Sequence, residues 1–317
     1  MAPLAVRNEY ARNFAPSPEK FGTTAAAIIN LSVPEMRDSF QHHHIPVFDA
    51  ATDACFKMLR GYIDYGRFLK TRNLLRHAET RSSEARAAVA AILKTHLNGS
   101  MLPHAPTVDL LKYYGFQCAD YRFASNGDEA GDAARKLGFP VILKGMVANV
   151  AHRSDAGLVS RKISSDAELQ PEFAALEARA LKTTNGSAPV SVEKYFPHDL
   201  EVILGVNYDV TFGPVILCGL GGIFTEILKD YALRLAPLTD DDARDMLSSL
   251  KAFPILNKAA SIDSLTDALL RLSDLAIDLN GKIAAVDINP LALRSDPPAV
   301  LVLDAKIHGW KNRTGES

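Results

Sequence analysis

The sequence predicts an α/β or α+β fold with mixed sheets, because short apolar strand patterns alternate with longer helical patterns from about residue 105 onward. Gly115 and Gly138 each close a helical pattern, and glycine is favoured at helix C-termini. The strand patterns at 189–196 and 200–208 are separated by a short turn and predict a hairpin-like pair. The chain has 317 residues, 47% of them hydrophobic, which is enough for about two domains.

Residues 1–75 predict only part of an α/β domain. Apolar runs at 25–31 and 45–48 have the length of short strands, and helical spacing of apolar residues follows over 51–69. Two strands and one helix bury little core by themselves. We therefore expect this segment to be the end of a larger domain.

Residues 76–104 predict a linker that contains one helix. Ser82 and Ser83 can cap this helix, which is expected to end near Leu97 because Asn98-Gly99 follows. The further expected helices span 107–114, 128–137, 167–184, 239–253 and 261–279. The further expected strands span 117–123, 139–144, 189–196, 200–208, 214–219, 282–288 and 299–303.

The composition argues against several classes of partner. The formal net charge of −2 gives no electrostatic reason to expect nucleic acid or an anionic membrane. The most apolar stretch, 210–228, is interrupted by Pro214, by three glycines after it and by Glu226, so it does not predict a membrane span. Three widely spaced cysteines fit neither a zinc site nor a disulfide framework, and the first residues show no signal-peptide pattern. We therefore expect a cytoplasmic protein that binds neither nucleic acid nor a membrane.

Lys144 and the loop after it are the first candidates for chemistry. Lys144 ends an apolar strand, where a cation can meet a phosphate, and the alternative is an ordinary surface lysine. The loop 145–159 contains His152 within His-Arg-Ser-Asp. Such a histidine can be a solvated surface group, a general base or a nucleophile that accepts a phosphoryl group, and its surroundings in the sequence leave all three open.

Glycines after the strand 214–218 are a second candidate. Gly219, Gly221 and Gly222 would let backbone N–H groups approach an anion. The signal is weak by itself. It matches neither the P-loop pattern, which needs Gly-Lys-Ser/Thr, nor the GxGxxG dinucleotide fingerprint.

Acidic and amide side chains near the C-terminus predict a metal site. Asp287 and Asn289 lie two residues apart on one expected strand, so strand alternation places both on one face. A second strand is followed closely by Asp304. Hard oxygen ligands from two strands suit Mg²⁺ bound to nucleotide phosphates, and we prefer this to the alternative that these acids merely end strands.

Several long motifs resemble the ATP-grasp region of NDP-forming acyl-CoA synthetases. This group includes the ADP-forming acetyl-CoA synthetases and is related to the β subunit of succinyl-CoA synthetase. The longest motif is FGPVILCGLGGIFTEILKDYALRLAPL, at 212–238. The others, in the family's order, are PVILKGMVANVAHRSDAGLV, VEKYFPHDLEVILGV, VDINPLAL and LVLDAKI. The resemblance covers roughly residues 100–306, and motifs of this length in this order are highly specific.

The resemblance implies an ATP-grasp fold with a small lobe at about 105–195 and a large lobe at about 196–310. Residues 1–75 resemble the tail of a flavodoxin-like CoA-ligase subdomain through HHHIPVFDAATDACFKMLRGYIDYGRFL. No CoA-binding fingerprint is recognisable, so the resemblance implies that CoA is bound by another domain or by a partner subunit. The chain is then expected to be a fragment, or one subunit, of an acid–CoA ligase that forms ADP. The identity of the acid, the choice of ATP or GTP and the oligomeric state stay open.

The resemblance also implies how the nucleotide is held. Lys144 is expected at the phosphates of ATP or ADP, Glu193 near the adenine, and Glu201 beside the ribose or the phosphates. Arg234 is expected near the path of the phosphoryl group. The glycine turn at 219–222 is expected to receive phosphate through backbone N–H groups.

For the reaction, the resemblance implies a phosphohistidine. His152 is expected to relay the phosphoryl group between the nucleotide site and the CoA-ligase part, while Asp287, Asn289 and Asp304 hold Mg²⁺. Departures from the family pattern lie close to these residues. The family usually reads HKSDVGGV where this chain reads HRSDAGLV, so Leu158 replaces a glycine and is expected to stiffen the loop.

Two other functions are weighed against this one. A nucleotide-sensing regulatory module without turnover would resemble some relatives that are fused to acetyltransferase domains, but it has no need of His152. An ATP-grasp carboxylate–amine ligase forms an acyl phosphate without a phosphohistidine, and the specific GLGGIFTEILKD match argues against it.

Overall fold

The computed structural model describes residues 27–28, 47–48, 56–57, 60–61, 63, 83–97, 101–147, 150, 153–184, 189–209, 211–221, 230–259, 262–297 and 299–310. The chain divides into two compact units, Met1–Leu75 and Arg76–Ser317. In the first unit, β1 (Ala27–Ile28) and β2 (Val47–Phe48) pair in parallel, and each lies within a run expected to be a strand. The helix expected over 51–69 lies mostly outside the described residues.

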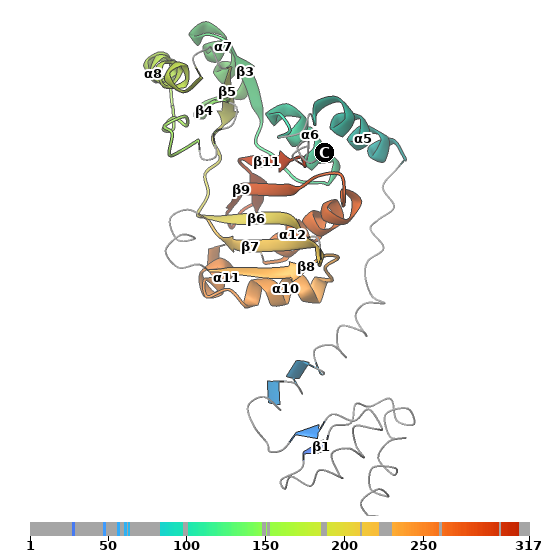
Figure 1. Ribbon diagram of the computed structural model, residues 1–317. Coiled ribbons are helices and arrows are strands. Elements are labelled where there is room, and N and C mark those ends of the chain that lie inside the picture. Colours follow the sequence, from blue (N-terminus) through green and yellow to red (C-terminus); the bar gives the residue numbers. More distant parts are fainter. Residues whose placement is uncertain are drawn as a thin grey trace, which may run out of the picture. The chain divides into compact units, whose positions relative to one another are not determined.

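The second unit is built around a six-stranded antiparallel sheet (Figure 1). The strand order is β10-β9-β6-β7-β8, and β11 also pairs with β9. The strands are β6 (Leu200–Asp209), β7 (Gly213–Leu220), β8 (Tyr231–Leu235), β9 (Ala285–Leu293), β10 (Val300–Val302) and β11 (Ala305–His308). Because β10 and β11 pair with successive parts of β9, the two residues between them, 303–304, lie beside the middle of that strand.

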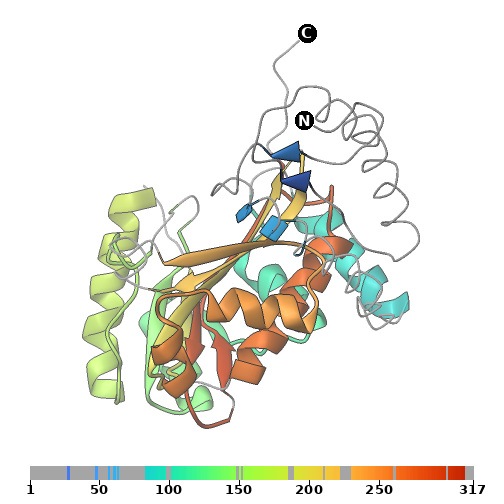
Figure 2. The same ribbon diagram turned by 90° about the horizontal axis from the view of Figure 1, so that it is seen from below.

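Helices cover one face of this sheet and leave the other face for the site. α10 (Asp240–Ser248) and α12 (Ile262–Asp278) pack against its strands, and α11 (Phe253–Ala259) lies between them in sequence (Figures 1 and 2). Alternate residues such as Leu204 on β6 and Ile288 on β9 are fully buried in the resulting core. Their neighbours in sequence, such as Ile203 and Asp287, therefore point to the opposite face.

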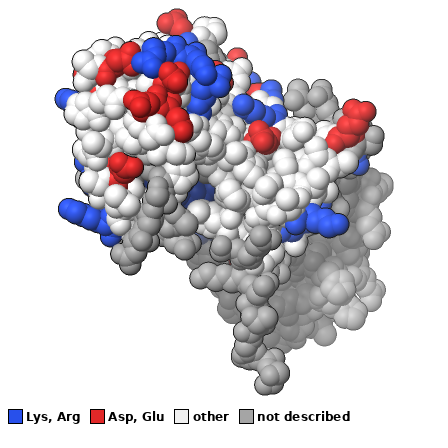
Figure 3. Space-filling view, turned by 90° about the horizontal axis from the view of Figure 1, so that it is seen from above, with Lys and Arg blue, Asp and Glu red and all other residues white. Residues whose placement is uncertain are grey.

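A second, three-stranded antiparallel sheet has the order β3-β5-β4. Its strands are β3 (Tyr121–Ala124), β4 (Val141–Gly145) and β5 (Val190–Lys194), and it is accompanied by α7 (Gly127–Leu137) and α8 (Asp166–Thr184). The Asn126 side chain caps α7 by accepting from the Glu129 N–H, and Gly138 ends the helix at a φ of 79°. Figure 3 shows acidic and basic side chains mixed on the described surface of this region, where Arg135 pairs with Asp132 and Asp166.

The hairpin expected from residues 189–196 and 200–208 is not formed by β5 and β6. They belong to different sheets, because residues 195–199 carry the chain from the smaller sheet to the larger one. The partner of β6 along the chain is instead β7, with pairs running from Val202–Leu220 to Asp209–Gly213. A short connection between two strand patterns thus marks a crossing between sheets rather than a turn within one.

Helices α5 (Ser83–His96) and α6 (His104–Tyr113) pack differently from what the expected linker and small lobe imply. The sequence predicts α5 in a linker at 76–104 and a small lobe that begins at about residue 105. Val89 and Leu93 of α5, and Leu110 and Leu111 of α6, are instead buried in the core of the larger sheet. Both helices present an apolar stripe that this core covers.

The sequence patterns do not predict three of the elements: β8, α11 and β11. The helix expected over 239–253 is two helices. α10 begins with a capping box between Thr239 and Asp242 and ends at Ser248, and α11 begins at Phe253. None of the helices among the described residues combines the length and apolarity that a membrane span requires.

Candidate active site

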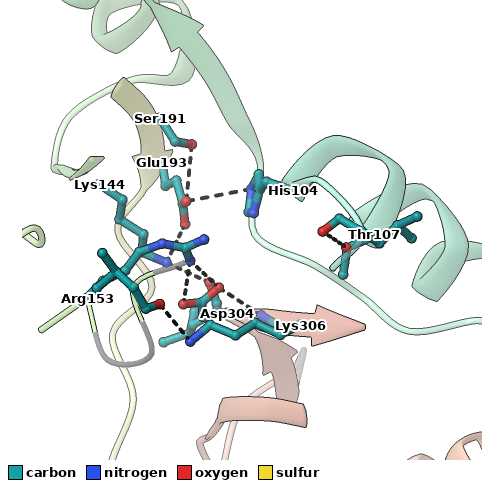
Figure 4. Close-up of polar contacts among 12 residues, drawn as sticks. His104, Thr107, Lys144, Arg153, Ser191, Glu193, Asp304 and Lys306 are labelled. Atoms are coloured by element: carbon teal, nitrogen blue, oxygen red, sulfur yellow. Dashed lines mark hydrogen bonds and ion pairs between the residues drawn. The ribbon is translucent and has the colours of Figure 1, made fainter. Parts of the chain in front are cut away.

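A cavity of about 700 Å³ lies between the two sheets of the second unit. Residues of β4 and β5 line it on one side and residues of β6 and β9 on the other, and the segments 153–155, 195–198 and 303–306 complete its wall. Pockets of this volume commonly hold small-molecule ligands and cofactors. Charged side chains from both sheets meet at this cavity (Figure 4).

Lys144 and Glu193 form a buried ion pair on the smaller sheet. Strand alternation turns Leu143 into the core and leaves Lys144 facing the cavity. The Lys144 Nζ lies 2.8 Å from the Glu193 Oε2 and also donates to the Leu303 carbonyl oxygen at 2.6 Å, which ties the two sheets together. The Ser191 hydroxyl donates to the Glu193 Oε1 at 3.1 Å. Two of the three ammonium N–H groups thus have partners among the described residues, which leaves one for an anion in the cavity.

The larger sheet contributes the oxygen-bearing side chains that the sequence singles out. Asp287 and Asn289 line the cavity from β9, and Asp304 lines it from the turn between β10 and β11. The Asn289 N–H donates to the Asp304 carbonyl oxygen at 3.0 Å, which fixes this turn against β9. The structure therefore brings together three of the predicted residues, two from β9 and one from the turn between β10 and β11.

This set of donors fits a magnesium ion that is bound together with a nucleotide. Two carboxylates and one amide supply hard oxygen atoms, and Mg²⁺ usually takes one or two carboxylates and completes its shell with phosphate and water. The described residues contain no cluster of three His, Cys, Asp or Glu side chains that could hold a metal by themselves.

Arg153 connects the loop after β4 to this turn. Its Nη1 lies 2.8 Å from both Asp304 carboxylate oxygens, and 8% of its side chain is exposed. The Ala305 N–H also donates to the Asp304 Oδ1 at 2.9 Å. The prediction for His152, which precedes Arg153 in sequence, falls outside the described residues. Leu158, which is expected to stiffen the loop, is fully buried, and its N–H donates to the Arg153 carbonyl oxygen at 2.8 Å.

His198 and Glu201 form a second polar pair in the cavity wall. The His198 Nε2 lies 3.0 Å from the Glu201 Oε1, and its Nδ1 lies 2.8 Å from the Phe196 carbonyl oxygen. Both partners only accept hydrogen bonds, so only the imidazolium form can satisfy both. The hydrogen bond to Glu201 is the main reason that the pKa of His198 is raised above its ordinary value.

The glycine turn needs correction, because its described glycines serve packing. The Gly221 N–H donates to the Glu201 carbonyl oxygen at 2.7 Å, so it is not available to a phosphate. A Cβ at Gly221 would lie 2.9 Å from the same oxygen, and a Cβ at Gly219 would lie 3.0 Å from the Asp230 carbonyl oxygen. These glycines allow close approach of backbones. Gly222 lies outside the described residues.

Arg234 also needs correction. It lies on β8 opposite Ile216, on the face of the sheet that the helices cover, whereas the cavity lies on the other face. Its Nη2 pairs with the Asp245 Oδ2 of α10 at 2.6 Å. The structure therefore does not bring Arg234 to the cavity.

The sequence patterns do not predict two of the cavity residues, Arg153 and His198, as part of the site. In the sequence, Arg153 differs from the family pattern only by replacing the lysine of HKSDVGGV, and its partner Asp304 lies 151 residues further along the chain. His198 receives no role at all, and the only signal for it is its spacing of three residues from Glu201 in a turn. The contact of Arg153 joins distant segments, and such contacts leave no pattern in a single sequence.

Comparisons with known proteins find related chains with the same fold. The family described as ATP-grasp domain matches residues 95–308. The chain is 35% identical over 206 residues to the β subunit of ADP-forming acetate–CoA ligase I of Pyrococcus furiosus, and this match covers 63% of the chain and 88% of the relative. The crystal structure of PH1788 from Pyrococcus horikoshii is 35% identical, with a TM-score of 0.64, and the match covers 71% of this chain and 97% of that one.

A further solved structure contains ligands. It is the dinucleotide-forming acetyl-coenzyme A synthetase 1 of Candidatus Korarchaeum cryptofilum, in complex with coenzyme A and Mg-AMPPCP, with its phosphohistidine segment pointing towards the nucleotide-binding site. It is 28% identical, with a TM-score of 0.58, and the match covers 71% of this chain and 99% of that one.

Proposed function

We propose the function of this chain from one premise: it belongs to the ATP-grasp family and is a relative of the β subunits of ADP-forming acetate–CoA ligases. It is the ATP-binding part of an ADP-forming acid–CoA ligase that works through a phosphohistidine. We infer that the cavity between its two sheets holds the nucleotide with Mg²⁺, and that a partner subunit or domain binds CoA.

One observation carries this proposal. The cation of Lys144 and the oxygen donors Asp287, Asn289 and Asp304 converge on one cavity from two sheets. A nucleotide triphosphate needs cationic partners for its phosphates and hard oxygen ligands for its metal. The loop that contains His152 continues directly into Arg153 and Asp155 in the wall of that cavity.

The proposed chemistry is transfer of the terminal phosphoryl group from ATP to His152. A bond forms between an imidazole nitrogen and the phosphorus, the bond from phosphorus to the bridging oxygen breaks, and ADP leaves with that electron pair. Lys144 and Arg153 offset the negative charge on the transferring group. A magnesium ion held by Asp287, Asn289 and Asp304 would supply further positive charge at the phosphates when bound.

The remaining cavity residues are proposed to position the nucleotide. Glu193 holds Lys144 in place through the 2.8 Å ion pair. We propose that the adenine binds close to this pair, beside residues 194–196. Glu201, fixed by His198 at 3.0 Å, is proposed to accept hydrogen bonds from the ribose. We assign no nucleotide contact to Arg234, because its guanidinium is paired with Asp245 on the other face of the sheet.

The first unit is proposed to belong with the CoA-ligase part. Its parallel pair of short strands, β1 and β2, is the arrangement expected of a flavodoxin-like subdomain. The site for the acid is proposed to lie in the partner, since the residues described here provide the nucleotide half of the reaction.

Labelling of the purified chain with γ-³²P-ATP and Mg²⁺ tests the proposed function. We expect label on the wild type that is labile in acid and stable in base, as a phosphoramidate is, and none on His152→Ala. Arg234→Gln is the matched control and should label like the wild type. If Mg·ADP binds but no label appears even with the CoA-binding partner present, the chain is a nucleotide sensor without turnover.

A further inference from the structure

His104 lies beside the proposed nucleotide site but has no role in it so far. It is the first residue of α6, and 8% of its side chain is exposed. Its ring makes an edge contact with Tyr121 of β3, with ring centroids 4.8 Å apart. Neither ring nitrogen has a hydrogen-bond partner among the described residues. A buried polar atom without a hydrogen-bond partner lowers the stability of the folded state, so its presence suggests a functional role.

The carboxylate of Glu193 lies close to the ring of His104. The His104 Nε2 lies 3.9 Å from the Glu193 Oε1, which is too long for a hydrogen bond but within reach of a small rotation (Figure 4). In the present arrangement Glu193 is already neutralised by Lys144 at 2.8 Å and receives a hydrogen bond from Ser191. The imidazole of His104 therefore lies next to the Glu193 carboxylate, which already forms an ion pair with Lys144.

Burial favours the neutral form of the His104 ring. Burial is the main reason that its pKa is lowered, and the positive charges of Lys144 and Arg153 lower the pKa further. The negative charges of Glu193 and Asp304 oppose this shift. The two cations that repel a proton on His104 are also the two that face the proposed phosphate position.

We propose that His104 is a positioning residue that takes up one proton when the nucleotide binds and then donates an N–H to Glu193. Phosphate oxygens engage Lys144 and Arg153, so their positive charge no longer repels a proton on the ring. Because Lys144 then also binds phosphate, its ion pair with Glu193 becomes weaker. The protonated ring of His104 supplies a second cation for the Glu193 carboxylate. The proton comes from the buffer, one N–H bond forms on the imidazole, and no other covalent bond changes.

This inference rests on the proposed nucleotide site and adds a pH dependence to it. Uptake of a proton with the ligand makes the affinity for nucleotide rise as the pH falls. For one whole proton the rise is about tenfold for each pH unit, within the window between the pKa of His104 in the free protein and its pKa in the complex.

Calorimetric titration with Mg·ADP in two buffers of different ionisation enthalpy counts the protons taken up. At pH 7.0 we expect the wild type to take up more protons than His104→Gln, by a fraction that approaches one. The comparison cancels proton exchange by the nucleotide itself. His96→Gln, a substitution at the exposed end of α5, is the matched control and should behave like the wild type.

The possible outcomes separate the two proposals. Absence of any binding heat in the wild type would sink the nucleotide site itself. Normal binding with the same number of protons in wild type and His104→Gln would overturn only the role of His104. A second measurement needs no variant: the ring proton resonances of His104, assigned through their contact with Tyr121, should shift to imidazolium positions when Mg·ADP is added. A ring that stays neutral in the complex at pH 6.5 contradicts the inference.

Discussion

Strands β9 and β8 belong to the same sheet, and the family resemblance ties both to the nucleotide, yet only β9 reaches the cavity. Asp287 and Asn289 lie on the open face of the sheet, whereas Arg234 lies on the face covered by helices and pairs with Asp245. The difference arises from strand alternation, because a shift of one residue moves a side chain to the opposite face. A polar residue in a specific motif therefore becomes part of a site only if its strand presents it to the shared cavity.

The largest effect is expected when a carboxylate at the cavity is removed, and a carboxylate on the helix-covered face serves as the comparison. Asp304→Asn removes a proposed metal ligand, and Asp245→Asn removes the partner of Arg234 on the covered face. Each change takes the carboxylate away from an arginine, so the pair is matched. We expect Asp304→Asn to lower the rate of Mg²⁺-dependent labelling by about 100-fold or more, because charge at the phosphates is lost. Asp245→Asn should stay within about twofold, and an equal loss in both variants would contradict the comparison.

The second prediction concerns the buried pair on the smaller sheet. Lys144→Met leaves Glu193 as a buried carboxylate without its cation, so we expect the free energy of unfolding to fall by about 3 kcal/mol. The double variant Lys144→Met/Glu193→Gln should recover most of this stability, but it should not recover the affinity for Mg·ADP. Urea unfolding and calorimetry measure the two quantities. If the double variant also binds Mg·ADP like the wild type, Lys144 does not contact the phosphates.

The third prediction tests the structural role of the glycine turn. Gly221→Ala places a Cβ 2.9 Å from the Glu201 carbonyl oxygen, so β6 or β7 must shift, at a cost of about 1–3 kcal/mol. Gly131→Ala within α7 is the control, because the nearest atoms to its Cβ belong to the flexible side chain of Arg135 at 3.3 Å. That variant should be neutral or up to about 1 kcal/mol more stable. Equal thermal stability of both variants would show that the glycine turn is not tightly packed.

The smallest expected effect is a pH dependence at His198. Its pKa is raised above the ordinary value of 6.5, chiefly by the hydrogen bond to Glu201. The stabilisation is therefore complete below about pH 6.5 and is lost as the pH rises through the pKa of the folded state. His198→Gln should lower the melting temperature at pH 6 and have less effect at pH 8.5. A larger loss at pH 8.5 than at pH 6 would mean that His198 is held as the neutral ring.

Local rules explain how much of the fold is predictable from the sequence. The helices α7, α8 and α12 follow from apolar spacing and from caps such as Gly138. The position of Asp287 and Asn289 on one face of β9, towards the cavity, follows from the period of two in a strand. Each of these inferences needs only residues that are close together in the chain.

The misses in the arrangement of the sheets and of α5 depend on which distant segments meet. The separation of β5 from β6 into two sheets, the burial of α5 and the pairing of β8 with β7 are decided by tertiary packing. The same holds for the contact of Lys144 with Glu193, which requires the register that sets Lys144 opposite Ser191. A single sequence carries the side chains of such contacts but not the register that joins them.

A structure of the chain with Mg²⁺ and AMPPCP would show whether the cavity between the two sheets is the nucleotide site. We predict that the phosphates lie within hydrogen-bond distance of Lys144 and that oxygen atoms of Asp287, Asn289 and Asp304 bind the metal. A nucleotide bound instead beside Gly219, Gly221 and Arg234, on the β7–β8 side of the sheet, would contradict this prediction.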